Sequence, residues 1–194
     1  MGWKERWCDI EENERPLLDK VTSVGVVAYT GELARGREFS ILFVEQLDQP
    51  ERRWGIPAGK FELGLDANPE EAAVREVLEE TKLVITEDRL EPFYAVPKPP
   101  YVKSAEYETL KLIFKCQVSQ GETEALGDWQ PIHISEWTPP ILLLRGPMRE
   151  GEIGDMVLVP KDNLFYQGNP MTAKIFRMDL HIFLKRYLEG LNII

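Results

Sequence analysis

Cysteine is scarce in this sequence, whose 194 residues include only Cys8 and Cys116. The two are far apart and outside any spacing typical of metal ligands, so no disulfide framework is expected, and a reducing compartment is the simplest location. Long apolar runs are also missing. No segment reaches membrane-spanning length, and the N-terminal stretch does not resemble a signal peptide. We therefore expect a cytoplasmic protein that does not associate with a membrane.

The chain also lacks an excess of basic residues. Its 23 lysines and arginines are outnumbered by 33 aspartates and glutamates, which gives a formal net charge of −10. Because phosphate backbones are bound by clustered Lys and Arg, this balance argues against a nucleic-acid polymer as a partner. A small phosphorylated ligand remains open, because a bound cation can reverse the local field.

The length and the composition, 43% hydrophobic and 29% charged, are those of one globular domain over residues 1–194. Residues 1–19 form an N-terminal extension to it, and residues 121–149 are interpreted as an insertion, either an extra hairpin or a lid. The chain order is strands, loop, acidic helix, strands and final helix. This order predicts an α/β chain of the α+β type, with a mixed β-sheet sandwiched between helices.

Residue patterns locate the individual elements. β-Branched and alternating apolar residues predict strands, a Gly- and Pro-rich stretch predicts a structured loop, and Asn-Pro pairs before apolar residues at helical spacing predict two helices. The predicted strands are 20–31, 38–47, 109–118 and 155–160, the loop is 52–64, and the helices are 68–82 and 169–191.

The helix at 68–82 carries an unusual set of acidic residues. Its spacing places Glu76 beside both Glu79 and Glu80, an arrangement that is unfavourable unless a positive charge lies between them. A hard divalent cation such as Mg²⁺ would satisfy three carboxylates, and Arg75 could hold one of them. The alternative is a solvated, charged helix face, and the helix alone does not decide between the two.

The loop before this helix favours the first interpretation. "WGIPAGKFELG" followed by "EEAAVREVLEET" resembles the signature of the Nudix hydrolases. In that signature a Gly is followed by five residues, a Glu, seven residues and then Arg-Glu-aliphatic-any-Glu-Glu-any-Gly-aliphatic. The positions that match are Gly59, Arg75, Glu76, Val77, Glu79, Glu80 and Leu83. The resemblance implies the Nudix fold, with a catalytic loop-helix motif at 55–83 and a C-terminal helix.

The resemblance also implies roles for these residues. Glu76, Glu79 and Glu80 would be the ligands of a Mg²⁺ or Mn²⁺ ion, and Arg75 would orient them as part of the catalytic group. Gly59 would bring the backbone close to the metal and the phosphates, which suits a residue without a Cβ atom. The family cleaves a nucleoside diphosphate linked to another moiety, so the implied function is a metal-dependent pyrophosphohydrolase of an ADP-ribose-like or other nucleotide derivative.

The sequence departs from the signature at three places. Two extra residues lie between Gly59 and Arg75, so Leu65 stands at the strict spacing of the family's middle Glu and Asp66 is the nearest acid. Ala58 replaces the first residue of the usual Gly pair. Lys82 replaces the Gly after Glu-Glu, and there either the helix ends in a left-handed residue at a cost of about 1 kcal/mol, or it ends differently with Lys82 near the negative end of its dipole.

Other residues are candidates for catalysis and substrate binding. Glu150 and Glu152, just before a predicted strand, could supply the general base. Aromatic residues expected in loops, Trp54 and Tyr94 among them with Phe93 and Tyr101, could stack on a nucleobase. Arg53 and Lys60 lie near enough to the motif to contact phosphates. For each of these residues, packing or solvation is the alternative role.

A different class of function also fits the altered motif. The fold could bind a nucleotide, or regulate a partner, with little or no catalysis. A homodimer is left open, because the Trp-containing segment at 121–149 could cover an interface.

Overall fold

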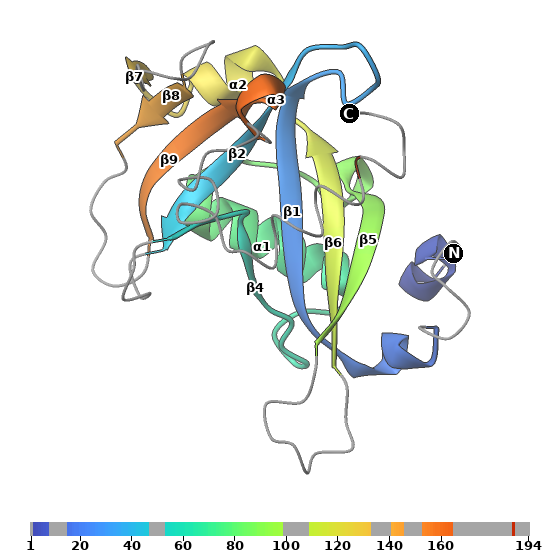
Figure 1. Ribbon diagram of the computed structural model, residues 1–194. Coiled ribbons are helices and arrows are strands. Elements are labelled where there is room, and N and C mark those ends of the chain that lie inside the picture. The colour runs from blue at the N-terminus through green and yellow to red at the C-terminus, as the bar shows by residue number, and fades with distance from the viewer. Residues whose placement is uncertain are drawn as a thin grey trace. The chain divides into compact units, whose positions relative to one another are not determined.

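The computed structural model describes residues 2–7, 15–46, 53–98, 109–132, 141–145, 153–164 and 188 (Figure 1). Contacts within the chain group it into two compact units. Unit 1 comprises Met1–Val27 and Pro57–Cys116, and unit 2 comprises Ala28–Ile56 and Gln117–Ile194. No helix among the described residues is long and apolar enough to cross a membrane.

Unit 1 contains the acidic helix and the strands around it. Its elements are η1 (Trp3–Trp7), η2 (Arg15–Lys20), the first part of β1 (Val21–Gly31), β4 (Ala58–Lys60), α1 (Pro69–Thr81), η3 (Glu87–Arg89), β5 (Glu91–Lys98) and β6 (Thr109–Gln117). The strand order is β5-β6-β1, and β4 pairs antiparallel with β1 in a register that sets Gly59 opposite Val24. This short strand attaches residues 58–60 of the Gly- and Pro-rich stretch to β1.

Helix α1 forms where its sequence signals predict. The Asn68 side chain accepts a hydrogen bond from the Glu71 backbone N–H at 2.8 Å, and Pro69 occupies the first helical position, where no donor is needed. Ala72, Ala73 and Val77 are buried on its inner face. Burial of this stripe holds the helix against unit 1 and leaves Glu71 and Glu79 exposed.

Unit 2 is built mainly from antiparallel strands. Its elements are the last part of β1, β2 (Phe39–Gln46), β3 (Arg53–Gly55), α2 (Gln120–Glu124), β7 (Gln130–Ile132), β8 (Ile141–Leu144), β9 (Ile153–Pro160) and α3 (Lys161–Leu164). The strand order is β1-β2-β9-β8-β7, and β3 pairs with β2 outside this order. Its core contains consecutive buried strand residues, 41–44 on β2 and 156–159 on β9.

The mixed α+β fold predicted from the sequence is confirmed, as are the predicted strands now seen as β1, β2, β6 and β9. The interpretation of 52–64 as a loop was wrong in part, because the short strands β3 and β4 lie within it. In the segment 121–149, β7 and β8 pair antiparallel, as the hairpin alternative requires. The predicted helix 169–191 lies outside the described residues apart from Leu188.

Candidate functional site

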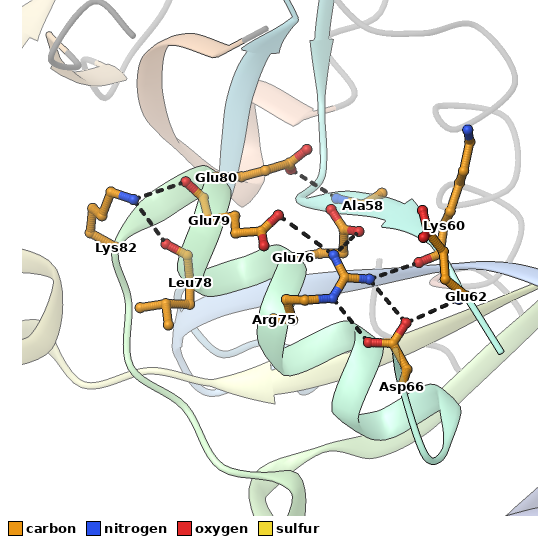
Figure 2. A network of polar contacts seen from close by, with 10 residues as sticks. All are labelled: Ala58, Lys60, Glu62, Asp66, Arg75, Glu76, Leu78, Glu79, Glu80 and Lys82. Carbon is orange, nitrogen blue, oxygen red and sulfur yellow. Dashed lines mark hydrogen bonds and ion pairs between the residues drawn. The ribbon is translucent and has the colours of Figure 1, made fainter. Parts of the chain in front are cut away.

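The site is built where β4 passes the outer face of α1 in unit 1 (Figure 2). A Cβ atom added to Gly59 would lie 2.1 Å from the carboxyl carbon of Glu76, so this carboxylate rests directly on the glycine backbone. Burial raises the pKa of Glu76, and the hydrogen bond from Arg75 opposes that shift. A half-buried carboxylate in this position favours a positive partner.

Arg75 lies at the centre of the network and provides one positive charge (Figure 2). Its Nη1 donates to Glu76 Oε1 at 2.8 Å and lies 3.5 Å from Glu79 Oε2, while its Nη2 donates to the Lys60 carbonyl at 3.1 Å. The guanidinium also binds Asp66 through two parallel bonds, Nε to Oδ1 at 2.9 Å and Nη2 to Oδ2 at 3.0 Å. A planar fork of this kind fixes both partners.

Asp66, the acid nearest to the strict spacing, is the buried partner of Arg75. Its side chain accepts a further bond from the Glu62 backbone N–H at 3.0 Å and the residue is only 4% exposed, whereas Leu65, at the strict spacing, is 60% exposed. The bond from Arg75 holds the pKa of Asp66 below its usual value. The sequence identified Asp66 only as the nearest acid, because a tight turn in the longer loop is needed to bring it under Arg75.

Glu79 and Glu80 differ in how they are held. Glu80 Oε2 accepts a hydrogen bond from the Ala58 backbone N–H at 2.9 Å, which ties the end of α1 to β4. The Glu79 side chain is 57% exposed, and among the described residues its ion-pair contact is the longer one to Arg75. Within the described ranges, no three His, Cys, Asp or Glu residues gather closely enough to hold a metal ion. The three candidate ligands therefore share one helix face without forming a closed metal site.

Lys82 combines features of both alternatives considered for the helix end. Its backbone adopts the left-handed conformation, with φ 67° and ψ 4°, and its N–H donates to the Leu78 carbonyl at 3.0 Å. Among the described residues it is the one non-glycine residue with positive φ. Its ammonium group also donates to the Glu79 carbonyl at 3.2 Å and to the Leu78 carbonyl at 3.5 Å, which complements the negative end of the helix (Figure 2).

The remaining candidates are spread over the two units. Lys60 is exposed at the end of β4, and Figure 2 shows its side chain directed away from Asp66. Trp54 is half-buried on β3 of unit 2, next to Arg53 on the same strand. The placement of Trp54, Phe93 and Tyr94 in loops was wrong, because all three lie on strands.

Tyr94 and Phe93 lie on β5, both are buried, and their rings contact each other with centroids 5.3 Å apart. The candidate bases Glu150 and Glu152 and the aromatic residue Tyr101 lie outside the described residues.

A comparison with protein families decides the identity of the fold. The model of the NUDIX domain matches residues 19–154, which is more than half of the chain. The chain belongs to the Nudix family. The resemblance carried by Gly59 and the acidic helix is thereby confirmed, together with the predicted Nudix fold. No curated protein sequence matches the chain.

Solved structures agree with this assignment. The NUDIX domain of Shewanella oneidensis NrtR complexed with ADP ribose has a TM-score of 0.54 and 14% identity, over 98% of this chain and 99% of that one. Shewanella oneidensis NrtR itself gives 0.53 at 15% identity, and its complex with a 27mer DNA gives 0.51 at 15% identity. These two comparisons cover 87% of this chain but 62% and 61% of NrtR. At such identities the likeness shows the fold alone.

Proposed function

We propose that this Nudix protein is a metal-dependent pyrophosphohydrolase that cleaves a nucleoside diphosphate linked to another moiety. The observation that carries the proposal is the arrangement on α1, where Arg75, anchored by Asp66, holds the carboxylate of Glu76 against Gly59. A helix face that was only charged and solvated would not need a buried aspartate to hold its arginine, or a glycine in close contact with one of its carboxylates.

The residues fit a divalent cation by their chemistry. Glu76, Glu79 and Glu80 would hold Mg²⁺ or Mn²⁺ through carboxylate oxygens, with the Gly59 backbone close by, because hard cations prefer oxygen ligands. When bound, the ion would neutralise the diphosphate and lower the pKa of a coordinated water. Arg75 has a separate task, since its bonds to Asp66 keep it beside Glu76 and orient that carboxylate.

A nucleotide ligand is supported at the level of the fold, because the NUDIX domain of NrtR was crystallised with ADP ribose. We extend this to an ADP-ribose-like or related nucleotide derivative here. Lys60 or Arg53 would contact the phosphates and Trp54 would stack on the nucleobase, whereas Tyr94, buried against Phe93 on β5, has the alternative packing role. The general base is assigned to Glu150 or Glu152, and a cytoplasmic location is retained from the scarcity of cysteine.

Glu80→Gln tests the catalytic proposal. It keeps the size of the side chain and an oxygen acceptor for the Ala58 N–H but removes the charge a metal needs. Hydrolysis of ADP-ribose, NADH, dinucleoside polyphosphates, nucleotide sugars and damaged nucleoside triphosphates should require Mg²⁺ or Mn²⁺, and the variant should lose about 100-fold or more in kcat.

Glu71→Gln is the matched control, because Glu71 is an exposed residue of the same helix and Gln keeps an acceptor for the Ala67 N–H. It should retain wild-type activity. Full activity in Glu80→Gln would refute the assignment.

A second candidate is a nucleotide-binding or regulatory module without chemistry. It is favoured because two of the three candidate metal ligands already have hydrogen-bond partners within the protein. Glu76 accepts from Arg75, and Glu80 accepts from the Ala58 amide. Calorimetry with Mg²⁺ and the same nucleotides, with phosphate release followed in parallel, separates the two. Tight binding without release supports the module. Although NrtR was crystallised with DNA, the net charge of −10 argues against a nucleic-acid partner for this chain.

A further inference from the structure

The first described residues of the chain contact unit 1 at a point removed from the candidate metal ligands. We call residues 2–7, which contain η1, the N-terminal arm. The arm precedes the part of the chain that the family model matches, residues 19–154. Arg6 and Trp7 contact α1, the residue before β5, and β6, whereas Lys4 of the arm pairs with Asp19 of η2.

Arg6 joins the first turn of α1 to the start of β5. Its Nη1 donates to Glu70 Oε1 at 3.2 Å, and its Nη2 donates to the carbonyl of Leu90, the residue before β5. The Glu70 side chain is only 3% exposed, so the ion pair is largely removed from water on its acidic side. Loss of the partner would destabilise a buried carboxylate of this kind, because an unpaired buried charge is costly in free energy.

Trp7 forms the apolar half of the contact. It is 3% exposed, and its ring meets the ring of Phe114 on β6 edge to face, with centroids 5.2 Å apart at an interplanar angle of 76°. This is a favourable geometry for an aromatic pair. Glu70, the Leu90 carbonyl and Phe114 thus form a surface that binds an Arg-Trp pair, and we call these three groups the arm site.

The contact is incomplete in its hydrogen bonds. Two buried polar atoms, the Trp7 indole Nε1 and Glu70 Oε2, have no hydrogen-bond partner among the described residues. Buried polar groups without partners oppose burial, so docking of the arm gains less than its contact area would suggest. Burial also raises the pKa of Glu70 and the charge of Glu87 on η3 adds to the rise, while a hydrogen bond from the backbone of Glu70 and the charge of Arg6 oppose it. These features indicate a contact that can open.

We propose that the N-terminal arm is a reversible strap, whose docking at the arm site orders the first turn of α1 and whose release loosens it. When Arg6 leaves, the buried Glu70 carboxylate loses its ion-pair partner. The turn that Glu70 occupies, begun by the Asn68 cap, then has less to hold it. The stability of the first turn of α1 would then depend on residues 2–7, which lie outside the range that the family model matches.

Hydrogen exchange of the full chain, read by mass spectrometry, tests this strap. Arg6→Ala should speed exchange about 10-fold or more in two places, the arm itself and the α1 amides of residues 71–73. Arg6→Lys keeps the charge but cannot donate to Glu70 and to the Leu90 carbonyl from two separate nitrogens. It should give an intermediate increase in the exchange rate.

Lys4→Ala is the matched control. Lys4 lies on the same arm and carries the same charge, but it pairs with the exposed Asp19 rather than with the arm site. It should leave exchange in residues 71–73 unchanged. Three outcomes would overturn the proposal: unchanged exchange in Arg6→Ala, faster exchange in the arm without any change in residues 71–73, or an equal increase that extends to the amides of β9 in unit 2.

A metal titration connects the strap to the proposed function and rests on it. Because α1 also carries Glu76, Glu79 and Glu80, Arg6→Ala should weaken Mn²⁺ binding several-fold in electron paramagnetic resonance titrations, and Lys4→Ala should not. Absence of Mn²⁺ binding by the wild-type chain would count against the metal site, whereas the exchange data alone decide whether the strap exists.

Discussion

The carboxylate of Glu76 occupies the space that a side chain at Gly59 would fill. An ideal Cβ on Gly59 would lie 2.1 Å from both the carboxyl carbon and one oxygen of Glu76, closer than any real contact. The requirement for glycine therefore comes from the approach of a side chain on α1, since Gly59 is not among the residues with positive φ. The glycine and the glutamate act as one structural unit.

Gly59→Ala should displace Glu76 and impair the site. The added methyl group forces the carboxylate away from β4 at little cost in packing, because the atoms it meets are the end of a flexible side chain. We expect weaker Mn²⁺ binding and a loss of any pyrophosphohydrolase activity, with a small change in the midpoint of urea unfolding. Gly121→Ala is the control, because an added Cβ there meets no atom within 4 Å. Equal behaviour of the two variants would contradict the steric role of Gly59.

Lys82 allows the cost of a left-handed helix end to be measured. Lys82→Gly relieves the conformation but loses the bonds of the ammonium group to the Leu78 and Glu79 carbonyls. Lys82→Ala loses those bonds and keeps the strain. Lys82→Gly should therefore be more stable than Lys82→Ala by about 1 kcal/mol in chemical denaturation, and the wild type should lie between them or close to the glycine variant. A more stable alanine variant would contradict the assignment of strain.

Much of unit 1 could be predicted because its signals are local. Asn68 and Pro69 mark the start of α1 in the sequence itself, and the apolar stripe fixes which face is buried. Strand β5 was missed because Pro92 and Pro97 interrupt its pattern and a register shift near Pro92 breaks the alternation. A run with two prolines reads as a loop when its pairing with a neighbouring strand is unknown.

The candidate site shows the same division between local and distant signals. The spacing of the glutamates on α1 predicts that they share a face, but not that Glu80 is held by a backbone amide of β4. Asp66 is nine residues from Arg75. Its pairing depends on the turn at Glu62, which no short motif in the sequence encodes.

Asp66→Asn should destabilise the fold at neutral pH and not in acid. The Asn side chain cannot form the charged pair with Arg75, and loss of hydrogen bonds to a charged group costs about 1–3 kcal/mol. The pKa of Asp66 is lowered in the folded state, so the wild-type advantage is present above its ordinary value, near 4, and is lost as the pH falls through the folded value. The difference in Tm between wild type and variant should be largest near pH 7 and shrink below about pH 4.

Asp88→Asn separates this effect from the general loss of an acidic residue. Asp88 also has a lowered pKa, but its carboxyl group is fully exposed on η3, and the main cause is a hydrogen bond with Thr86, with smaller contributions from the backbone and from the charge of Arg89. Its variant should show almost no change in Tm at neutral pH. If Asp66→Asn behaved like Asp88→Asn, the paired hydrogen bonds between Arg75 and Asp66 would contribute little to stability, and Arg75 would be held by Glu76, Glu79 and the Lys60 carbonyl. Reduced Mn²⁺ affinity in Asp66→Asn at pH 7, with Asp88→Asn unchanged, would show in addition that the fork orients Glu76.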